Sequence, residues 1–242
     1  MTDEAVRLRE LHRPGDPLVL PNVWDAASAR VVQEAGFPAL ATASAAISAM
    51  LGYPDGEGAP VDEMFAAAAR VIRVAEVPVT VDAEAGYGLP PGELVARLLE
   101  MGAAGCNLED SRDGGLLDPE RQAAYLAEVR AAAGDALVIN ARADTFIRQA
   151  PDPLDGALAR GRRYLAAGAD CVYPIMAPAD AVKALVDGLA GPVNVNQFPG
   201  TSLGELAAAG AARVSYGPFP HMHAMESLKE FAGRLRAGED PA

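Results

Sequence analysis

The chain alternates short runs of β-type residues with longer helical stretches, and this order recurs eight times along its 242 residues. Such an alternation is typical of repeated strand–helix units and disfavours an antiparallel meander. Eight units can close a parallel barrel, which usually takes roughly 250 residues. The eight runs are Leu18–Pro21, Ala39–Ala43, Val79–Ala83, Gly105–Glu109, Leu137–Ala141, Cys171–Ile175, Val193–Asn196 and Arg213–Tyr216.

Glycine phrases precede several of the runs, where a glycine can end the preceding helix in the left-handed conformation. They contain Gly36, Gly102, Gly168 and Gly210. The alternative of an open, doubly wound sheet would be expected to carry a glycine-rich dinucleotide turn after an early strand, and the segment 82–88 is too acidic to cradle a pyrophosphate. We therefore predict one domain over residues 1–242, an α/β fold with a single (β/α)₈ barrel.

The composition excludes several classes of partner. A net charge of −13 disfavours a nucleic-acid surface, which gains affinity from Lys and Arg. The segment Met1–Glu10 lacks the apolar core of a signal peptide, and no stretch approaches the roughly 20 apolar residues that span a bilayer. We expect a cytosolic protein without a membrane partner. Cys106 and Cys171 lie in apolar runs and are expected in the core.

Acidic side chains gather at the ends of the third and fourth predicted strands and in the loop after the second. They are Asp55, Asp82, Glu84 and Glu109. In a barrel the C-terminal strand ends and the following loops build the active site. Clustered carboxylates oppose folding unless a cation neutralises them, and hard oxygen ligands suit Mg²⁺ or Mn²⁺. We expect Asp82 to bind the metal directly and the others to hold it through water, although Asp55 could instead form a Pro-Asp-Gly turn.

Polar side chains at the ends of two later strands complete the predicted site. Arg142 ends the fifth strand, where its guanidinium could grip a substrate carboxylate at two points or could form an internal ion pair with Glu109 or Asp144. Asn194 and Asn196 in the seventh strand could bind substrate oxygens or satisfy loop backbone groups.

At these residues the sequence resembles the isocitrate lyase / phosphoenolpyruvate mutase superfamily over nearly its whole length. The motifs are Pro21-Asn22-Val23-Trp24-Asp25-Ala26, Leu51-Gly52-Tyr53-Pro54-Asp55, Asp82-Ala83-Glu84-Ala85-Gly86-Tyr87-Gly88, Asn107-Leu108-Glu109-Asp110, Asn140-Ala141-Arg142-Ala143-Asp144-Thr145-Phe146 and Val193-Asn194-Val195-Asn196. The motif at residues 82–88 is the most specific.

The resemblance implies a Mg²⁺ site at the four carboxylates and an α-keto or α-hydroxy carboxylate as substrate. It further implies that Arg142 and Asn194 contact this substrate, and that Trp24, Ser44 and Ala45 line the pocket for its carboxylate. The shared chemistry is stabilisation of an enolate during C–C or P–C cleavage. We assign catalytic roles to Arg142, Glu109 and Tyr53.

The segment after the fourth strand departs from the family pattern. Residues 111–119 lack the Lys-Lys/Arg-Cys-Gly-His lid of the lyases and the Lys and Asn-Ser lid of the phosphonomutases, and Ile175 stands where the latter carry a histidine. Tyr87 and Arg112 are further candidates for the unidentified general acid. We predict a Mg²⁺-dependent lyase that cleaves a C–C bond of a small 2-hydroxy or 2-oxo di- or tricarboxylate. The alternatives are a phosphonopyruvate-type mutase or hydrolase and a non-catalytic α-keto-acid-binding barrel.

The resemblance also implies assembly by exchange of the eighth helix between barrels. After Pro220, apolar residues recur at helical spacing in Met222, Met225, Leu228, Phe231 and Leu235. This stripe could cover its own barrel or a neighbouring one. We expect a homotetramer, or else a dimer.

Overall fold

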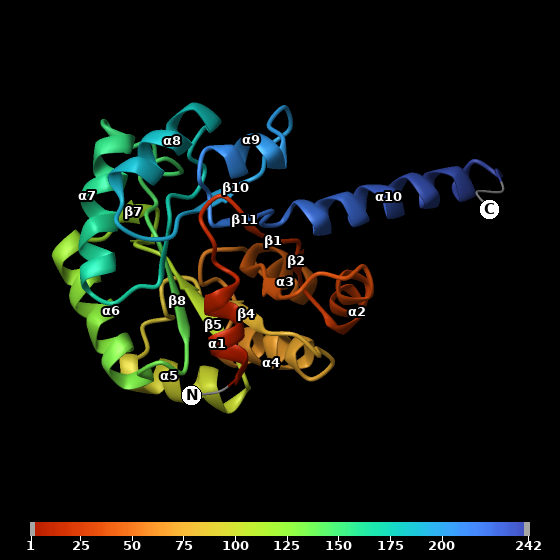
Figure 1. Ribbon diagram of the computed structural model, residues 1–242. Coiled ribbons are helices and arrows are strands. Elements are labelled where there is room, and N and C mark those ends of the chain that lie inside the picture. The colour runs from red at the N-terminus through yellow and green to blue at the C-terminus, as the bar shows by residue number, and fades with distance from the viewer. Residues whose placement is uncertain (1–2, 240–242) are drawn as a thin grey trace.

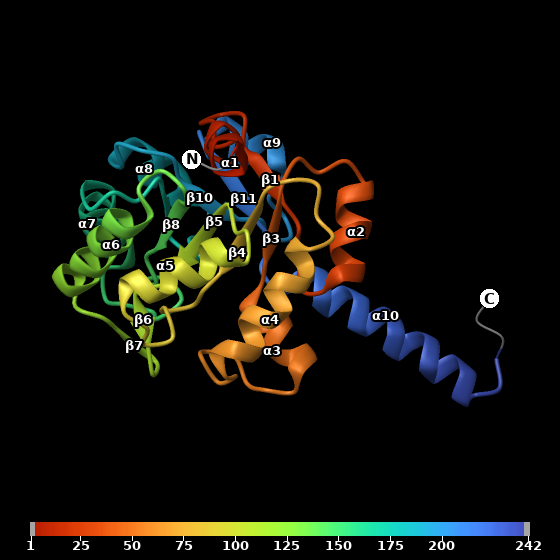
Figure 2. The same ribbon diagram turned by 90° about the horizontal axis from the view of Figure 1, so that it is seen from below.

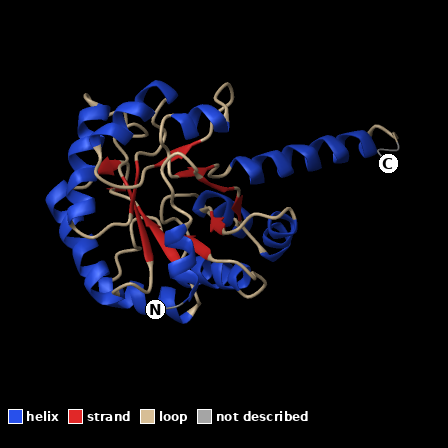
Figure 3. Cartoon of the chain, viewed as in Figure 1, coloured by secondary structure: helices blue, strands red, loops and turns tan. Residues whose placement is uncertain are grey.

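A closed ring of parallel strands lies at the centre of the computed structural model and helices surround it (Figures 1 and 3). The structure describes residues 3–239, so the two ends of the predicted domain, residues 1–2 and 240–242, lie outside it. Every one of the eight predicted runs overlaps a strand. These strands are β1 (Leu18–Leu20), β3 (Leu40–Thr42), β4 (Val79–Asp82), β5 (Gly105–Leu108), β8 (Val138–Arg142), β9 (Cys171–Tyr173), β10 (Asn194–Asn196) and β11 (Arg213–Ser215).

The ring closes through its first strand position, which is divided in two. β1 pairs with β11, whereas β2 (Asn22–Val23), two residues further along the chain, pairs with β3. The order then runs β3-β4-β5-β8-β9, and a bridge between Val172 and Val193 joins β9 to the β10 segment. All these pairs are parallel, so the predicted (β/α)₈ barrel is confirmed.

The outer helices bury apolar faces against the strands. They are α2 (Ala26–Glu34), α4 (Val61–Ile72), α5 (Pro91–Glu100), α6 (Pro119–Ala133), α7 (Pro153–Ala166), α8 (Ala179–Gly188) and α9 (Leu203–Ala208). Gly36, Gly102, Gly168 and Gly210 follow α2, α5, α7 and α9 with φ between +88° and +98°, so the predicted glycine helix ends are confirmed. At the N-terminal end of the barrel, α1 (Asp3–Glu10) packs Leu8 into the core.

Two elements on the C-terminal side were not expected from the sequence. The helix α3 (Ser44–Leu51) begins two residues after β3, and a small antiparallel hairpin of β6 (Ser111–Arg112) and β7 (Gly115–Leu116) follows β5. Both lie at the end of the barrel that carries the predicted carboxylates.

The last helix, α10 (Phe219–Arg236), projects from the barrel instead of covering it (Figures 1 and 2). None of its residues is buried within the chain. Its exposed apolar side chains are Phe219, Met222, Met225, Leu228, Phe231 and Leu235. In the described part of the chain, no helix is both long and apolar enough to cross a bilayer.

A layer of polar side chains fills the barrel interior below the carboxylates. Asn140 donates from Nδ2 to Asn107 Oδ1 (2.8 Å) and to Asn194 Oδ1 (2.9 Å). The fully buried Arg213 also donates to Asn107 Oδ1, at 3.2 Å. Both cysteines, Cys106 and Cys171, are buried as expected, and burial raises their thiol pKa values to about 12.

Candidate active site

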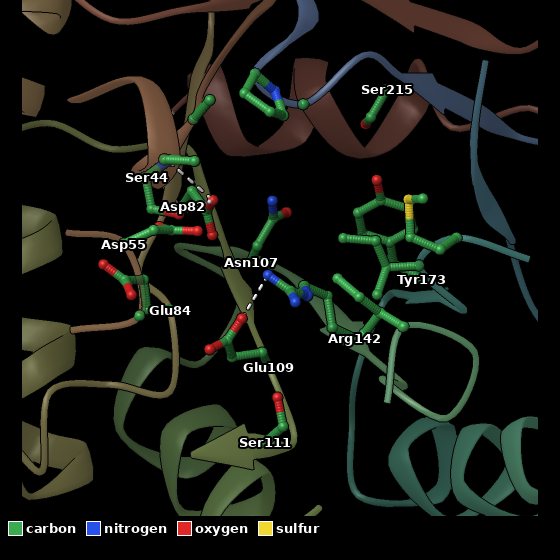
Figure 4. Close-up of a pocket in the computed structure, with 18 of the residues that line it drawn as sticks. Ser44, Asp55, Asp82, Glu84, Asn107, Glu109, Ser111, Arg142, Tyr173 and Ser215 are labelled. Atoms are coloured by element: carbon green, nitrogen blue, oxygen red, sulfur yellow. Dashed lines mark hydrogen bonds and ion pairs between the residues drawn. The ribbon is translucent and has the colours of Figure 1, made fainter. Parts of the chain in front are cut away.

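A cavity of about 580 Å³ opens at the C-terminal ends of the strands (Figure 4). Its walls come from the ends of β4, β5 and β8 and from the loops that follow β3, β5, β8, β9 and β11. This is the end where a parallel barrel places its active site. The cavity lining includes nine residues that the sequence analysis named as candidates: Ser44, Ala45, Asp55, Asp82, Glu84, Glu109, Arg112, Arg142 and Asn196.

Asp82 is held at the end of β4 by the first residue of α3. One carboxylate oxygen, Oδ2, accepts hydrogen bonds from the Ser44 backbone N–H (3.1 Å) and the Ser44 hydroxyl (2.8 Å). The other oxygen, Oδ1, is buried without a hydrogen-bond partner among the described residues. An unsatisfied buried carboxylate oxygen is costly, so Oδ1 is suited to bind a cation.

Two further carboxylates lie beside Asp82 (Figure 4). Burial raises the pKa of Glu84 to about 7, and the charges of Asp82 and Asp55 add to the shift. The pKa of Asp55 is raised by partial burial and by Asp82, although much of its surface is exposed. Glu84 also has a φ of +48°, which is a strained conformation for a residue with a side chain.

These carboxylates fit a divalent cation that keeps part of its water shell. Within residues 3–239, no three His, Cys, Asp or Glu side chains are grouped so that they could hold a metal ion together. Mg²⁺ often binds through one or two carboxylates and several waters, and does not need a complete protein cage. Oδ1 of Asp82 would be the direct ligand, with Asp55 and Glu84 reached through water.

Arg142 forms an internal ion-pair network at the cavity wall, the second of the two arrangements that the sequence allowed. Its Nη1 lies 2.5 Å from Glu109 Oε2, and its Nε and Nη2 donate to Asp144 at 3.1 and 2.9 Å. Burial raises the pKa of Glu109 above its ordinary value, whereas the Arg142 charge opposes that shift. The guanidinium is thus fixed in place by two carboxylates, and it still lines the cavity.

The hairpin β6–β7 lies in the segment that departs from the lid patterns of the superfamily that the sequence resembles, and an ion pair connects it to the loop that contains Glu57. Arg112 donates to both oxygens of Glu57, at 2.9 and 3.1 Å, and to the Ala85 carbonyl at 3.0 Å. Glu57 also accepts from the Tyr87 N–H at a short distance. Among the residues that the structure describes, the cavity lining includes no cysteine or histidine that could take the place of a lid thiol.

Trp24, Tyr53 and Asn194, which were also predicted for the site, do not line the cavity. The Trp24 ring packs edge-on against His221, with centroids 4.9 Å apart, because the loop after β2 turns toward α10. The Tyr53 hydroxyl donates to Glu63 of α4 at 2.9 Å. Asn194 is fully buried in the interior polar layer, where its side-chain amide accepts a hydrogen bond from Asn140 and donates one to the Ser215 hydroxyl.

Several cavity residues were not assigned roles from the sequence: Asn22, Asn107, Ser111, Arg148, Tyr173 and Ser215. Asn107 lies in β5 and Glu109 directly follows the strand, and since they are two residues apart both side chains point to the barrel interior. That alternation is the signal that could have identified Asn107. Arg148 carries no such signal, since it lies in the loop that follows β8.

Comparison with known proteins agrees with this architecture. Residues 8–236 match the protein family described as phosphoenolpyruvate phosphomutase. An uncharacterized protein of Mycobacterium tuberculosis is 34% identical over 232 residues, covering 95% of this chain and 89% of its own. The 2-methylisocitrate lyase of Bacillus subtilis is 31% identical over 180 residues, which are 70% of this chain and 59% of the lyase.

The solved structure of a Burkholderia cenocepacia protein, provisionally assigned as a phosphonomutase, superposes with a TM-score of 0.91. It is 42% identical in sequence, and the match covers 96% of this chain and all of the other. The extent of these matches confirms the resemblance drawn from the strand-end motifs. The chain therefore belongs to the phosphoenolpyruvate phosphomutase family, within the isocitrate lyase / phosphoenolpyruvate mutase superfamily of lyases and mutases.

Proposed function

We propose that the chain is a Mg²⁺-dependent lyase that cleaves a C–C bond of a small 2-hydroxy or 2-oxo di- or tricarboxylate. Mn²⁺ is an alternative metal for the same oxygen ligands. The observation that carries this proposal is Asp82, whose buried Oδ1 has no hydrogen-bond partner among the described residues and which lines a cavity together with Asp55, Glu84 and Arg142 (Figure 4).

The chain's own residues supply binding and charge stabilisation at this site. In the first turn of α3 the Ser44 N–H is donated to Asp82, whereas the Ala45 backbone N–H lacks an intrahelical partner and can donate to a substrate carboxylate. Arg142, oriented by Glu109 and Asp144, presents fixed positive charge to the negative charge that develops on the substrate. Bound Mg²⁺ would supply Lewis-acid stabilisation of the enolate formed when the bond breaks.

The roles proposed from the sequence for Tyr53 and Asn194 change. Tyr53 loses its geometric basis as an acid, because its hydroxyl is bound to Glu63 away from the cavity. Asn194 acts indirectly. Its Oδ1 accepts a hydrogen bond from Asn140, and Asn140 also donates to Asn107, which lines the cavity. Glu109 and Arg142 remain our candidates for residues that act on the substrate.

The second candidate function is P–C bond chemistry on a phosphonopyruvate-like substrate. It is favoured by three arginines in the cavity lining, Arg112, Arg142 and Arg148, where the sequence had offered only one near the lid. Similarity to the Burkholderia cenocepacia protein points the same way. The B. subtilis 2-methylisocitrate lyase supports the C–C reaction.

Turnover of a panel of 2-oxo and 2-hydroxy acids, together with phosphonopyruvate, tests both candidates. The lyase proposal expects a 2-oxo or 2-hydroxy di- or tricarboxylate to be cleaved with Mg²⁺ and left intact with a chelator. Cleavage of phosphonopyruvate alone would replace it with the second candidate. No turnover of any member would reject both.

We further propose a homotetramer, or else a dimer, in which α10 packs on a neighbouring barrel. The support is that α10 projects from its own barrel and leaves Met222, Leu228 and Phe231 about half exposed or more, at 55%, 58% and 47%. Apolar patches of this kind mark interaction surfaces. A cytosolic location also stays a prediction.

A further inference from the structure

Arg148 is a cavity cation with no carboxylate partner among the described residues. Its Nε and Nη2 donate to the Ser111 hydroxyl at 3.1 and 3.0 Å. The other two arginines of the lining form ion pairs with carboxylates: Arg112 pairs with Glu57, and Arg142 pairs with Glu109 and Asp144. A guanidinium has five N–H donors, so the whole Nη1 group of Arg148 is left available.

Ser111 gives the guanidinium a fixed orientation. It is fully buried, and its hydroxyl donates to Asp144 Oδ2 at 2.5 Å while it accepts from Arg148. The Ser111 hydroxyl proton is committed to Asp144, so the oxygen can only accept from Arg148. Asp144 in turn holds Arg142, and one hydrogen-bonded chain links Arg148 to the centre of the cavity.

The position of this pair relative to the carboxylates defines two ends of the cavity. Asp82 is paired in register with Asn107 of β5, and Ser111 lies four residues further along the same segment. Figure 4 shows Ser111 beyond Glu109 on the side away from Asp82, Asp55 and Glu84. A cation end and a carboxylate end thus face the same cavity.

We infer that Arg148, oriented by Ser111, forms a subsite for a second oxyanion of the substrate, a carboxylate or a phosphonate. The inference rests on the proposed function, because it takes the first carboxylate or keto group to lie at the Asp82 end. An unpaired guanidinium beside a cavity favours a planar or tetrahedral oxyanion, which can accept two N–H groups at once. The substrate then carries two acid groups, and a mono-acid leaves Arg148 without a partner.

Calorimetric titration of the full chain with Mg²⁺ present tests the subsite without requiring turnover. The probes are two matched pairs, lactate with malate and pyruvate with phosphonopyruvate, in which the second member adds one acid group. Arg148→Gln should weaken binding of at least one di-acid by about 10- to 100-fold, the loss expected for a charge-assisted hydrogen bond, and leave its mono-acid within about twofold. The control is Arg73→Gln, which changes an exposed arginine outside the cavity lining and should alter neither.

The two di-acids distinguish the source of the oxyanion. Loss for malate assigns a carboxylate, and loss for phosphonopyruvate assigns a phosphonate. The inference is overturned if the parent protein binds neither di-acid more tightly than its mono-acid, or if Arg148→Gln weakens both members of each pair equally. If binding depends on Arg148 but no 2-oxo or 2-hydroxy acid is turned over, the subsite is retained and the lyase proposal is rejected. If a di- or tricarboxylate is cleaved and Arg148→Gln changes neither its binding nor its turnover, the lyase proposal is retained and the subsite is rejected.

Discussion

Replacing Arg142 with lysine keeps the positive charge at the end of β8 but removes the planar guanidinium. In the structure three nitrogens are in use, with Nη1 beside Glu109 and both Nε and Nη2 on Asp144. A lysine ammonium is a single point of charge and cannot reach both carboxylates with this geometry. One of two buried carboxylates therefore loses its cation.

The size of the effect follows from which groups are left unpaired. Asp144 keeps the Ser111 hydroxyl, but Glu109 has no second cationic partner among the described residues. Hydrogen bonds to charged groups contribute about 1.5 to 3 kcal/mol each, and breaking a buried ion pair costs about 3 to 5 kcal/mol. Because lysine retains part of the pairing, we expect a loss of about 2 to 4 kcal/mol, which lowers the midpoint of thermal unfolding by about 5 to 15 °C.

Activity should fall further than stability alone would explain. The displaced charge no longer faces the substrate in a fixed geometry, so kcat/KM should drop on the order of 10²-fold. The matched control is Arg160→Lys, because Arg160 forms a comparable pair with the fully buried Asp110 at 2.8 Å but does not line the cavity. It should lose stability and keep substrate affinity. Calorimetric unfolding and steady-state kinetics on both variants measure this, and an Arg142→Lys protein with the unfolding midpoint and kcat/KM of its parent would refute the argument.

Three other predictions follow from separate parts of the molecule. Asp82→Ala should abolish specific Mg²⁺ binding measured by calorimetry and Glu84→Gln should weaken it less, so equal affinity for Asp82→Ala and the parent would contradict the metal site. Burial, aided by the charge of Arg213, lowers the pKa of His12 to about 4 in the folded chain. In the unfolded chain the pKa of a histidine is about 6.5, so between these two pH values the unfolded chain is protonated at His12 and the folded chain is not. The contribution of His12 is therefore present above about pH 6.5 and about 2 kcal/mol of it is lost by pH 5, which urea unfolding at both pH values can measure, with His12→Gln showing a smaller loss. Light scattering should give a mass above that of the 25.0 kDa monomer, and truncation before Met222 should reduce it, so an assembly that survives truncation would exclude α10 as the joint.

The sequence determined the barrel because its signals are local. Each strand lies in a short β-type run, and several preceding helices are followed by a residue such as Gly102 or Gly168 that adopts a positive φ. The carboxylates at the strand ends were predictable for the same reason, because parallel strands bring their C-terminal ends to one rim wherever they close into a ring. Asp82, Glu84 and Glu109 accordingly line one cavity.

Only the tertiary structure decided what those side chains meet. Trp24 and Tyr53 lie in loops, whose direction depends on distant contacts with His221 and Glu63 and not on local periodicity. Whether Arg142 is free or paired with Glu109 depended on the pairing of β5 with β8. These strands are separated along the chain by β6, β7 and α6, and only the folded sheet brings them together. Likewise the apolar stripe of α10 was visible in the sequence, but its projection away from the barrel is a property of the folded chain, because helical periodicity fixes which face is apolar and not what covers it.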